Sequence, residues 1–466
     1  MVKKLLILSA LASCFCQEIF TEYLIESQDT IDVFSYQIPQ GYDDGTAHPL
    51  LVAFHQWGGN ENSTYSTTFD EEANARGWIF MSPYGGSGNN YNHQGAQEMV
   101  RKEILWLVDH YAVDLDRIYM VGGSMGGAAG MIYANNHLNP DQPMVAAAAS
   151  GSGILDCERR AIEMDGNNSM IEWFGGNWDE VPFEYHRNSA IYFADSTQSM
   201  HYNLQHTPIY LDFGVSETHR IHAEEMYETL LGYNENMWID TDPTGSHGFS
   251  VMDEQHVCDW LSEFTLLSDP PSVHLNLDEP GRGYFFEAVN QINITDFISI
   301  DGYKTDNGLI INEYENSDSL ALHILNSSLS DYLLEVNINI NKLGITGSAM
   351  LNENTQIDSI YVTTIDGVEL SYTVEDNIIW LENYGLPPYE LPMYGNFILN
   401  IEMSVSSDGD INEDGSCNIQ DIILIISHII GSAFLSDDQA ALADMNDDGA
   451  IDIMDIIMVI NVIIEG

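Results

Sequence analysis

The stretch Arg117 to Gly127, RIYMVGGSMGG, decides the fold. Its apolar run, Ile118 to Val121, has the length and β-branched character of a buried strand and stops at a G-x-S-x-G pattern around Ser124. Glycines flank the serine because a Cβ there would collide with the strand or helix packed beside a sharp turn. The small-residue segment Met125 to Asn135 is typical of a helix start. The pattern therefore predicts strand, turn and helix, with the Ser124 hydroxyl lifted clear of a sheet.

Ser124 is the predicted nucleophile, and a serine hydroxyl needs a base to be activated. This kind of turn predicts the chain order serine, acid, histidine. Among 15 histidines, His247 fits best, because it lies in a glycine-rich loop just after the strand-like run Met237 to Thr241. Three other histidines are interpreted as solvated side chains: His206, His219 and His222.

The orienting acid is expected on the loop after the strand-like run Pro208 to Phe213. Glu217 stands on that loop and can hold the imidazole in one tautomer. Asp212 is a rival, although a residue inside a strand faces a neighbouring layer and is less able to reach a loop. Asp242, nearer His247 in the sequence, is a further alternative.

Two backbone amides are expected to bind the substrate oxyanion. The turn itself provides the amide of Met125. The strand-like run Leu50 to Phe54 leads into His55-Gln56-Trp57-Gly58-Gly59, whose glycines let the backbone approach the substrate. Trp57, or failing it Gln56, would donate the second amide. The Trp57 ring would lie against the acyl group or pack in the core.

In this order, HQWGG, GWIFMSPYG, RIYMVGGSMGG, PIYLDFGVSET and GSHGF resemble the α/β-hydrolase esterases, over about residues 30 to 265. Within them, the chain looks closest to the secreted feruloyl esterase and polyhydroxybutyrate depolymerase-like group. That resemblance implies a serine carboxylic-ester hydrolase, without a catalytic cofactor, that acts on phenolic esters of polysaccharide or on polyester, and the residues themselves predict a Ser-Glu-His triad. The family usually has His-Gly at His55-Gln56 and an aspartate at Glu217. Prolyl oligopeptidase-like serine peptidases share the serine turn, and a non-catalytic adhesive protein can keep the fold.

The N-terminus indicates export, because two lysines precede an apolar run, Leu5 to Ala12, and then small residues. We expect residues 1–16 to be a signal peptide cleaved before Gln17, which makes the protein secreted and extracellular. Leu11 to Cys14 also resembles a lipoprotein box, and lipid on Cys14 would instead anchor the protein to a cell surface.

Three cysteines follow the signal peptide: Cys157, Cys258 and Cys417. Three cysteines do not make a disulfide scaffold. Cys157 and Cys258 are both expected near one edge of the catalytic site. An oxidising compartment permits a bridge between them, and two separate buried thiols are the alternative.

The chain is long enough for several domains, and Ser268-Asp269-Pro270-Pro271 is typical of a linker. We predict an α/β catalytic domain over residues 17–267. Residues 273–404 alternate short apolar runs with Asn, Asp and Gly turns, which indicates an all-β, sandwich-like spacer or binding domain.

A duplicated acidic loop closes the chain, because Asp410 to Asp421 recurs 34 residues later as Asp444 to Asp455. The pattern gives Ca²⁺ ligands at loop positions 1, 3, 5, 7 and 12 and a glycine at position 6. The predicted ligands are Asp410, Asn412, Asp414, Ser416, Asp421, Asp444, Asn446, Asp448, Ala450 and Asp455, with Ser416 and Ala450 acting through their carbonyls. The apolar helices Ile422 to Ile430 and Ile456 to Ile464 are expected to pack on each other.

Duplicated calcium loops, each followed by one helix, resemble the type I dockerin, over residues 408–466. The resemblance implies a small all-α domain, structural calcium and a cohesin-type partner. At loop positions 10 and 11 the chain has Ile419-Gln420 and Ile453-Met454 instead of the small hydroxylated pairs of cellulosomal examples. A calcium-stabilised end module without a partner is the alternative.

Acidic residues outnumber basic ones by 72 to 13, for a formal net charge of -59. Such a chain repels phosphate backbones, so nucleic acid is excluded as a partner. Long-range repulsion also disfavours polymers rich in free carboxylates.

We predict that salt stabilises the protein, because it shortens the distance over which the acidic side chains repel one another. The melting temperature is expected to be several degrees higher in molar NaCl than in salt-free buffer. Differential scanning calorimetry measures this, and equal melting temperatures in the two buffers would contradict it.

Overall fold

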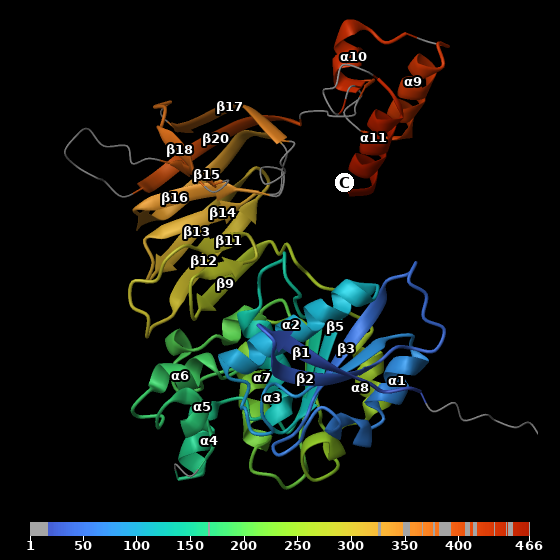
Figure 1. The fold of residues 1–466 in the computed structure, drawn as a ribbon. Coiled ribbons are helices and arrows are strands. Elements are labelled where there is room, and N and C mark those ends of the chain that lie inside the picture. Colours follow the sequence, from blue (N-terminus) through green and yellow to red (C-terminus); the bar gives the residue numbers. More distant parts are fainter. Residues whose placement is uncertain are drawn as a thin grey trace, which may run out of the picture. The chain divides into compact units, whose positions relative to one another are not determined.

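The computed structural model describes residues 17–165, 168–324, 328–347, 355–365, 367–375, 378–381, 393–405, 411–412, 417–432, 434–443, 445 and 451–465. The predicted signal peptide, residues 1–16, lies outside the described residues. The chain divides into two compact units, Met1–Lys304 with Ile311–Asp318 and Thr305–Ile310 with Ser319–Gly466. Figure 1 shows their elements.

An eight-stranded sheet forms the centre of the first unit, in the order β1-β2-β4-β3-β5-β6-β7-β8. The pairs from β4 through β3 to β8 are parallel, whereas β1 and β2 are antiparallel to their neighbours. The strands are β1 (Phe20–Glu26), β2 (Asp29–Gln37), β3 (His48–Phe54), β4 (Ile79–Pro83), β5 (Val113–Gly123), β6 (Ala147–Gly151), β7 (Ile209–Asp212) and β8 (Met237–Ile239).

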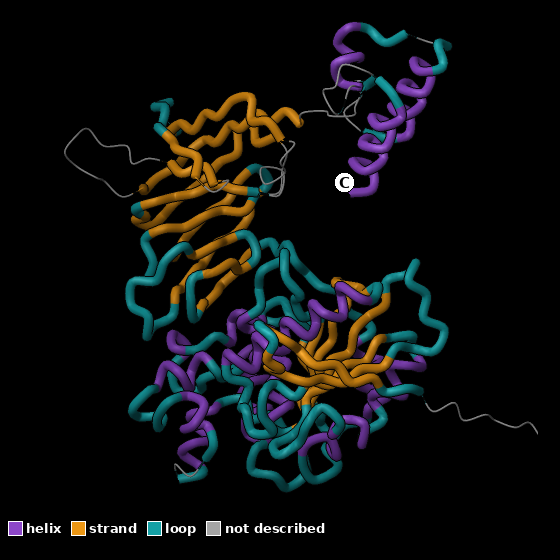
Figure 2. The backbone as a smooth tube through the Cα atoms, in the orientation of Figure 1, coloured by secondary structure: helices purple, strands orange, loops and turns teal. Residues whose placement is uncertain are grey.

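Helices cover both faces of this sheet (Figure 2). Side chains alternate along a strand, so Leu50 and Val52 pack in one core with α2 and α3, while Leu51 and Ala53 pack in another with α1 and α8. The helices are α1 (Phe69–Ala75), α2 (Gln94–His110), α3 (Met125–Asn136), α4 (Cys157–Glu163), α5 (Met170–Phe174), α6 (Pro182–Arg187), α7 (Arg220–Leu230) and α8 (Glu254–Leu261). This strand order and layering confirm the predicted α/β-hydrolase fold.

Two six-stranded sheets follow, as the alternating sequence pattern predicts. Their orders are β10-β11-β14-β16-β19-β18 and β17-β20-β15-β13-β12-β9, and β14 pairs with β16 in parallel. The strands are β9 (Ser272–Leu277), β10 (Gly281–Gly283), β11 (Phe286–Ala288), β12 (Ile298–Thr305), β13 (Gly308–Glu315), β14 (Ser319–His323), β15 (Ser328–Ile340), β16 (Lys342–Thr346), β17 (Thr355–Thr364), β18 (Tyr372–Glu375), β19 (Ile378–Leu381) and β20 (Met393–Val405).

Strand β9 and the turn after it are bonded to the hydrolase layers within the first unit. The amide of Asn276 donates to Asn203 Oδ1 (2.9 Å), and Arg187 donates to Asp278 (2.6 Å). The compact first unit therefore extends beyond Ser268 to Pro271, and the domain boundary expected there stays a prediction.

The C-terminal region is helical, with α9 (Ile419–Ile429), α10 (Asp437–Ala443) and α11 (Ile453–Glu465). Ile425 and Val459 are buried in one apolar cluster, and α9 contacts α11. The predicted packing of the two repeat helices is confirmed, and each helix begins three residues earlier than expected. Among the described residues, no helix has the length and apolar character needed to cross a membrane.

The proposed bridge between Cys157 and Cys258 is wrong, because both are free thiols. They lie in different apolar clusters. Cys157 packs in a cluster with Met125 and Tyr185, and Cys258, on α8, packs in the core on one face of the sheet. Burial raises the pKa of each thiol to about 12, so both remain protonated. The alternative of two separate buried thiols is confirmed.

Candidate active site

Ser124 lies on the sharp turn between β5 and α3. Its backbone has φ 57° and ψ -119°, a strained conformation for a residue with a side chain. A Cβ at Gly122 would meet the carbonyl oxygen of Gly126 at 2.1 Å, and a Cβ at Gly126 would meet that of Phe54 at 2.4 Å. Only glycine fits at these two positions, as the sequence pattern predicts.

The structure brings the three predicted residues together. His247 Nε2 lies 2.8 Å from Ser124 Oγ, and His247 Nδ1 lies 2.7 Å from Glu217 Oε2. Because a carboxylate only accepts, Nδ1 donates to Glu217 and Nε2 is left to accept the proton of the serine hydroxyl. Glu217 follows β7, and His247 follows β8 and immediately precedes the 3-10 helix Gly248–Val251.

Glu217 is suited to the role of the acid. Its side chain is 6% exposed, and the amide of Gly214 donates to Oε1 at 2.7 Å. Burial raises the pKa of Glu217, but hydrogen bonds from His247, Ser152 and Gly214 outweigh it, so that the pKa is lowered overall. The carboxylate thus stays charged beside the imidazole.

The pKa of Asp212, the rival acid, is shifted in the opposite direction to that of Glu217. It is buried, Oδ1 accepts from the amide of Phe213 at 2.8 Å, and burial together with Asp240 raises the pKa of Asp212 to about 8. A carboxyl that is neutral at pH 7 cannot stabilise an imidazolium. The amide of Asp242, the other alternative, donates to Asp240 (2.8 Å).

Three supporting contacts of the histidine loop were not predicted from the sequence. Ser152, with φ 56°, accepts from the amide of Gly248 at 2.9 Å, and Ser250 Oγ accepts from the amide of His247 at 3.2 Å. A Cβ at Gly214 would meet the Ser246 carbonyl oxygen at 2.2 Å. The contacts of Ser152 and Gly214 join the ends of β6 and β7 to the loop, and no local motif marks such long-range contacts, whereas Ser250 is only three residues from His247.

The predicted oxyanion donors lie at the ends of β3 and β5. Met125 begins α3 and is buried, and the side chain of Gln56 lies against Gly248, where a Cβ would meet Gln56 Oε1 at 1.9 Å. Trp57 is 60% exposed, so its ring is not a core side chain. The amide roles of Met125, Trp57 and Gln56 stay predictions.

The interpretation of three histidines as solvated is wrong. His222 is fully buried, and the His219 side chain is 11% exposed. His206 is half-buried and bonds to the carbonyl of Ser272 at 2.7 Å. Tertiary packing, rather than the polar local sequence, decides their burial.

In the two acidic loops, the structure describes three of the predicted ligands. Asp421 and Asp455 are fully buried at position 12 of their loops. The Asp421 carboxylate accepts from the amides of Asn412 (3.1 Å) and Asn418 (2.9 Å), and Asp455 accepts from those of Met445 and Asp452. The other predicted ligands lie outside the described residues: Asp410, Asp414, Ser416, Asp444, Asn446, Asp448 and Ala450.

The donor chemistry of both loops fits calcium. A buried carboxylate with few cationic neighbours is costly, and a hard cation with oxygen ligands offsets that cost. Asp421 and Asp455 are placed equivalently, since each accepts from a backbone amide at the start of its loop and from one just before its helix.

We predict that Asp212→Asn changes stability in a pH-dependent way. A carboxyl whose folded pKa is raised contributes stability below its unfolded pKa, about 4, and loses it as the pH rises through about 8. The melting temperature of the variant relative to the native chain should therefore rise by several degrees between pH 4 and 9. Exposed Asp109→Asn is the control, and a constant difference for Asp212→Asn would refute the assignment.

We predict that calcium stabilises the C-terminal helices through both loops. Removal of calcium with EDTA should lower the α-helical circular dichroism, and Asp421→Ala with Asp455→Ala should weaken calcium binding at least about tenfold. Isothermal titration calorimetry with CaCl₂ measures the affinity, with Asp109→Asn as control. Unchanged affinity in the double variant would contradict the prediction.

Comparison with known families identifies the C-terminal region. Residues 408–464 match the family model of the dockerin type I domain. A search of curated proteins finds no match.

Solved structures similar to the chain include several hydrolases. An S-formylglutathione hydrolase from Agrobacterium tumefaciens is 13% identical, with a TM-score of 0.39, over 53% of this chain and 94% of that one. A feruloyl esterase module from Clostridium thermocellum, complexed with sinapinate, is 14% identical, with a TM-score of 0.37, over 53% and 88%. The serine hydrolase FphF from Staphylococcus aureus is 13% identical, with a TM-score of 0.39, over 53% and 98%.

These similarities are too low to carry function, and the fold assignment depends on strand order and on the turn at Ser124. The chain combines a domain with the α/β-hydrolase fold, identified by its strand order and its serine turn, with a C-terminal type I dockerin domain.

Proposed function

We propose that the protein is a secreted serine esterase that hydrolyses carboxylic esters of extracellular polymers. The observation that carries this proposal is the continuous hydrogen-bonded series Ser124, His247 and Glu217, with separations of 2.8 and 2.7 Å. An activated serine on a strained turn is the arrangement that acyl transfer requires.

Each residue has one role in the proposed reaction. Ser124 Oγ attacks the ester carbonyl while His247 Nε2 takes its proton, and the charged Glu217 stabilises the imidazolium. The amides of Met125 and Trp57 hold the oxyanion. His247 then protonates the leaving alcohol, and water, activated by the same imidazole, releases the acid from Ser124.

Phenolic esters on polysaccharide are the first substrate class, and polyesters are the second. Trp57 lies just after β3, and its ring is exposed. The ring can therefore offer a flat apolar surface to an aromatic acyl group. The strongly acidic chain favours polymers with few free carboxylates.

The dockerin domain supports an extracellular location and a cohesin-type partner. Isoleucines at equivalent positions of the two repeats are exposed, Ile423 on α9 and Ile457 on α11, at 55% and 45%. Exposed apolar residues on a small module favour a protein partner. We propose calcium as the structural ion, and a lipid anchor at Cys14 remains the alternative to release.

We predict that Ser124→Ala abolishes ester turnover and that Glu217→Gln lowers kcat by about 10³- to 10⁴-fold. The measurement is hydrolysis of a panel of feruloyl, acetyl and polyester compounds, with calcium present. Asp212→Asn is the matched control, since it replaces a nearby neutral carboxyl group while the hydrogen bond of His247 to Glu217 is kept, and it should keep kcat within about threefold.

The rival functions give different results on the same panel. Faster cleavage of peptide anilides than of esters would favour a serine peptidase. No turnover of either class by the native chain would favour a non-catalytic adhesive protein.

A further inference from the structure

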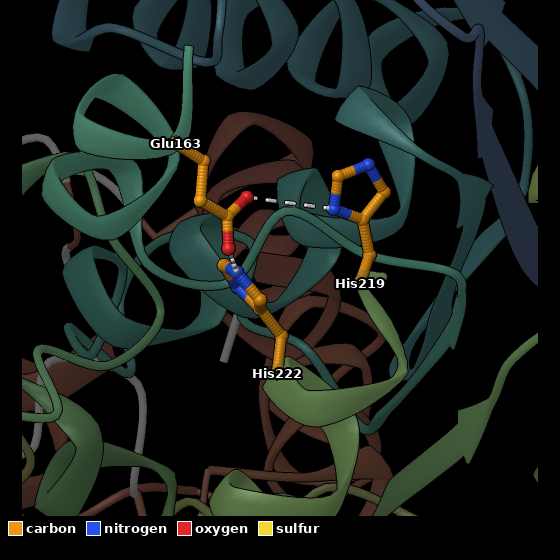
Figure 3. A group of neighbouring side chains, drawn as sticks. All are labelled: Glu163, His219 and His222. Carbon is orange, nitrogen blue, oxygen red and sulfur yellow. Dashed lines mark ion pairs between the residues drawn. The ribbon is translucent and has the colours of Figure 1, made fainter. Parts of the chain in front are cut away.

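A group of three polar side chains, of which His222 is buried, His219 half-buried and Glu163 exposed, lies beside the candidate triad. Glu163 ends α4, and His219 and His222 lie at the start of α7; Figure 3 shows the carboxylate facing both imidazole rings. Glu163 Oε2 lies 3.9 Å from His219 Nδ1, and Oε1 lies 3.9 Å from His222 Nε2. Among the described residues, neither of these nitrogens has a hydrogen-bond partner, and each lies 3.9 Å from an oxygen of the carboxylate.

The group contacts the proposed base directly. The ring centroid of His219 lies 5.5 Å from that of His247, with 56° between the planes. His219 follows Glu217 by two residues, so the turn that presents the acid also presents this second ring. The His247 side chain is 40% exposed, so solvent borders part of its imidazole. The His219 ring contacts this partly exposed imidazole and limits its rotation.

The three residues resemble a metal site, since their ligand atoms lie within 4.8 Å of one another. Two observations oppose a metal ion. His222 Nδ1 faces the amides of Leu155 (3.2 Å) and Asp156 (3.3 Å), so it must accept, and the proton of the neutral ring is on Nε2, the atom a metal would need. Arg160 already donates to Glu163 at 3.1 Å, which places a cation at the carboxylate.

The charge states of Glu163 and His219 are compatible with a position beside His247, the proposed general base. Contacts with His222 and then Arg160 outweigh burial and lower the pKa of Glu163 to about 2, so it is charged. Burial, ahead of Arg160 and His222, lowers the pKa of His219 to about 4, so its ring is neutral at pH 7. A neutral ring in contact with His247 does not repel the imidazolium that forms there.

We propose that His219 is a positioning residue for His247, held in place by the carboxylate of Glu163. This inference rests on the proposed esterase function. The ring restricts the rotation of the His247 imidazole, so that Nε2 stays aimed at Ser124. Glu163 offsets the charge of Arg160, which would otherwise disfavour a protonated His247.

Arg160, His222, His247 and Glu163 act electrostatically on His219, and these four together with the charged groups linked to them enter the expected pH dependence. They are Arg159, Arg160 and Glu163 from α4, Asp156 before it, His222 and Glu225 from α7, and Glu217 and His247 from the two loops. Arg159 lies closer to Glu225 (2.6 Å) than to Glu163 (3.8 Å). Arg160 lies 3.1 Å from Glu163, so the Glu163 carboxylate is paired mainly with Arg160.

The test compares His219→Ala, His219→Phe and Glu163→Gln with the native full-length chain in p-nitrophenyl acetate hydrolysis across pH. His219→Ala should lower kcat about tenfold with KM within about twofold, because a misplaced base affects the chemical step. His219→Phe keeps the ring contact and should restore kcat to within about threefold of native. The exposed His110→Ala is the control.

The pH profile separates positioning from a merely structural role. Removing the negative charge in Glu163→Gln leaves Arg160 unbalanced, which disfavours protonated His247. The acid limb of kcat/KM should therefore move to lower pH by a few tenths of a unit. His219→Ala removes a neutral group and should leave the limb in place. Melting temperatures check that each variant is folded.

Four results would overturn the inference: native kcat in His219→Ala, equal impairment in His219→Phe and His219→Ala, an unmoved acid limb in Glu163→Gln, or inhibition by micromolar ZnCl₂ that His219→Ala abolishes. The last would establish a metal site instead. These results all require an active native chain. Absence of ester turnover in the native chain would refute the proposed function itself.

Discussion

The close contact between the serine turn and its neighbours is the constraint on which the structure depends. The backbone of Gly126 passes the carbonyl of Phe54 so closely that no side chain fits between β3 and α3, and Gly122 faces Gly126 across the turn. This closeness forces Ser124 into its strained φ and ψ, and it places the end of β3 beside the first turn of α3. A strained nucleophile is maintained only where the surrounding packing over-determines it.

Packing on both faces of the sheet provides that rigidity. Alternate residues of β3, and likewise of β5, are buried in two separate cores, one on each face of the sheet. Close packing on both faces restricts the movement of these two strands. The acid and the base come from turns at the ends of the neighbouring strands β7 and β8, which are parallel to β5 through β6. Parallel strands present their carboxyl ends at one edge, and residues 123 positions apart in sequence meet there.

Much of this arrangement can be predicted from the sequence, because the decisive signals are local. Glycine spacing around Ser124 reports a steric requirement, and Glu217 and His247 follow strand-like runs in the expected order. Contacts between distant segments carry no such signal. The support from Ser152 and the burial of His222 depend on how α7 and the end of β6 pack. The proximity expected for Cys157 and Cys258 was wrong for the same reason, since they fall on helices that pack in different clusters.

The C-terminal loops show how one side chain serves two purposes. Asp421 closes its loop by accepting two amides, and one of these is the amide of Asn418 at the start of α9. Helix start and loop closure are therefore formed by the same carboxylate, and Asp455 repeats the arrangement.

The two thiols of the hydrolase domain have a practical consequence. Because Cys157 and Cys258 are unlinked and buried in apolar clusters, non-covalent contacts hold the described residues of this domain together. It needs no oxidative folding machinery. A reducing bacterial cytoplasm is therefore a suitable compartment for producing it recombinantly, and reductants in the purification buffers leave its covalent structure unchanged.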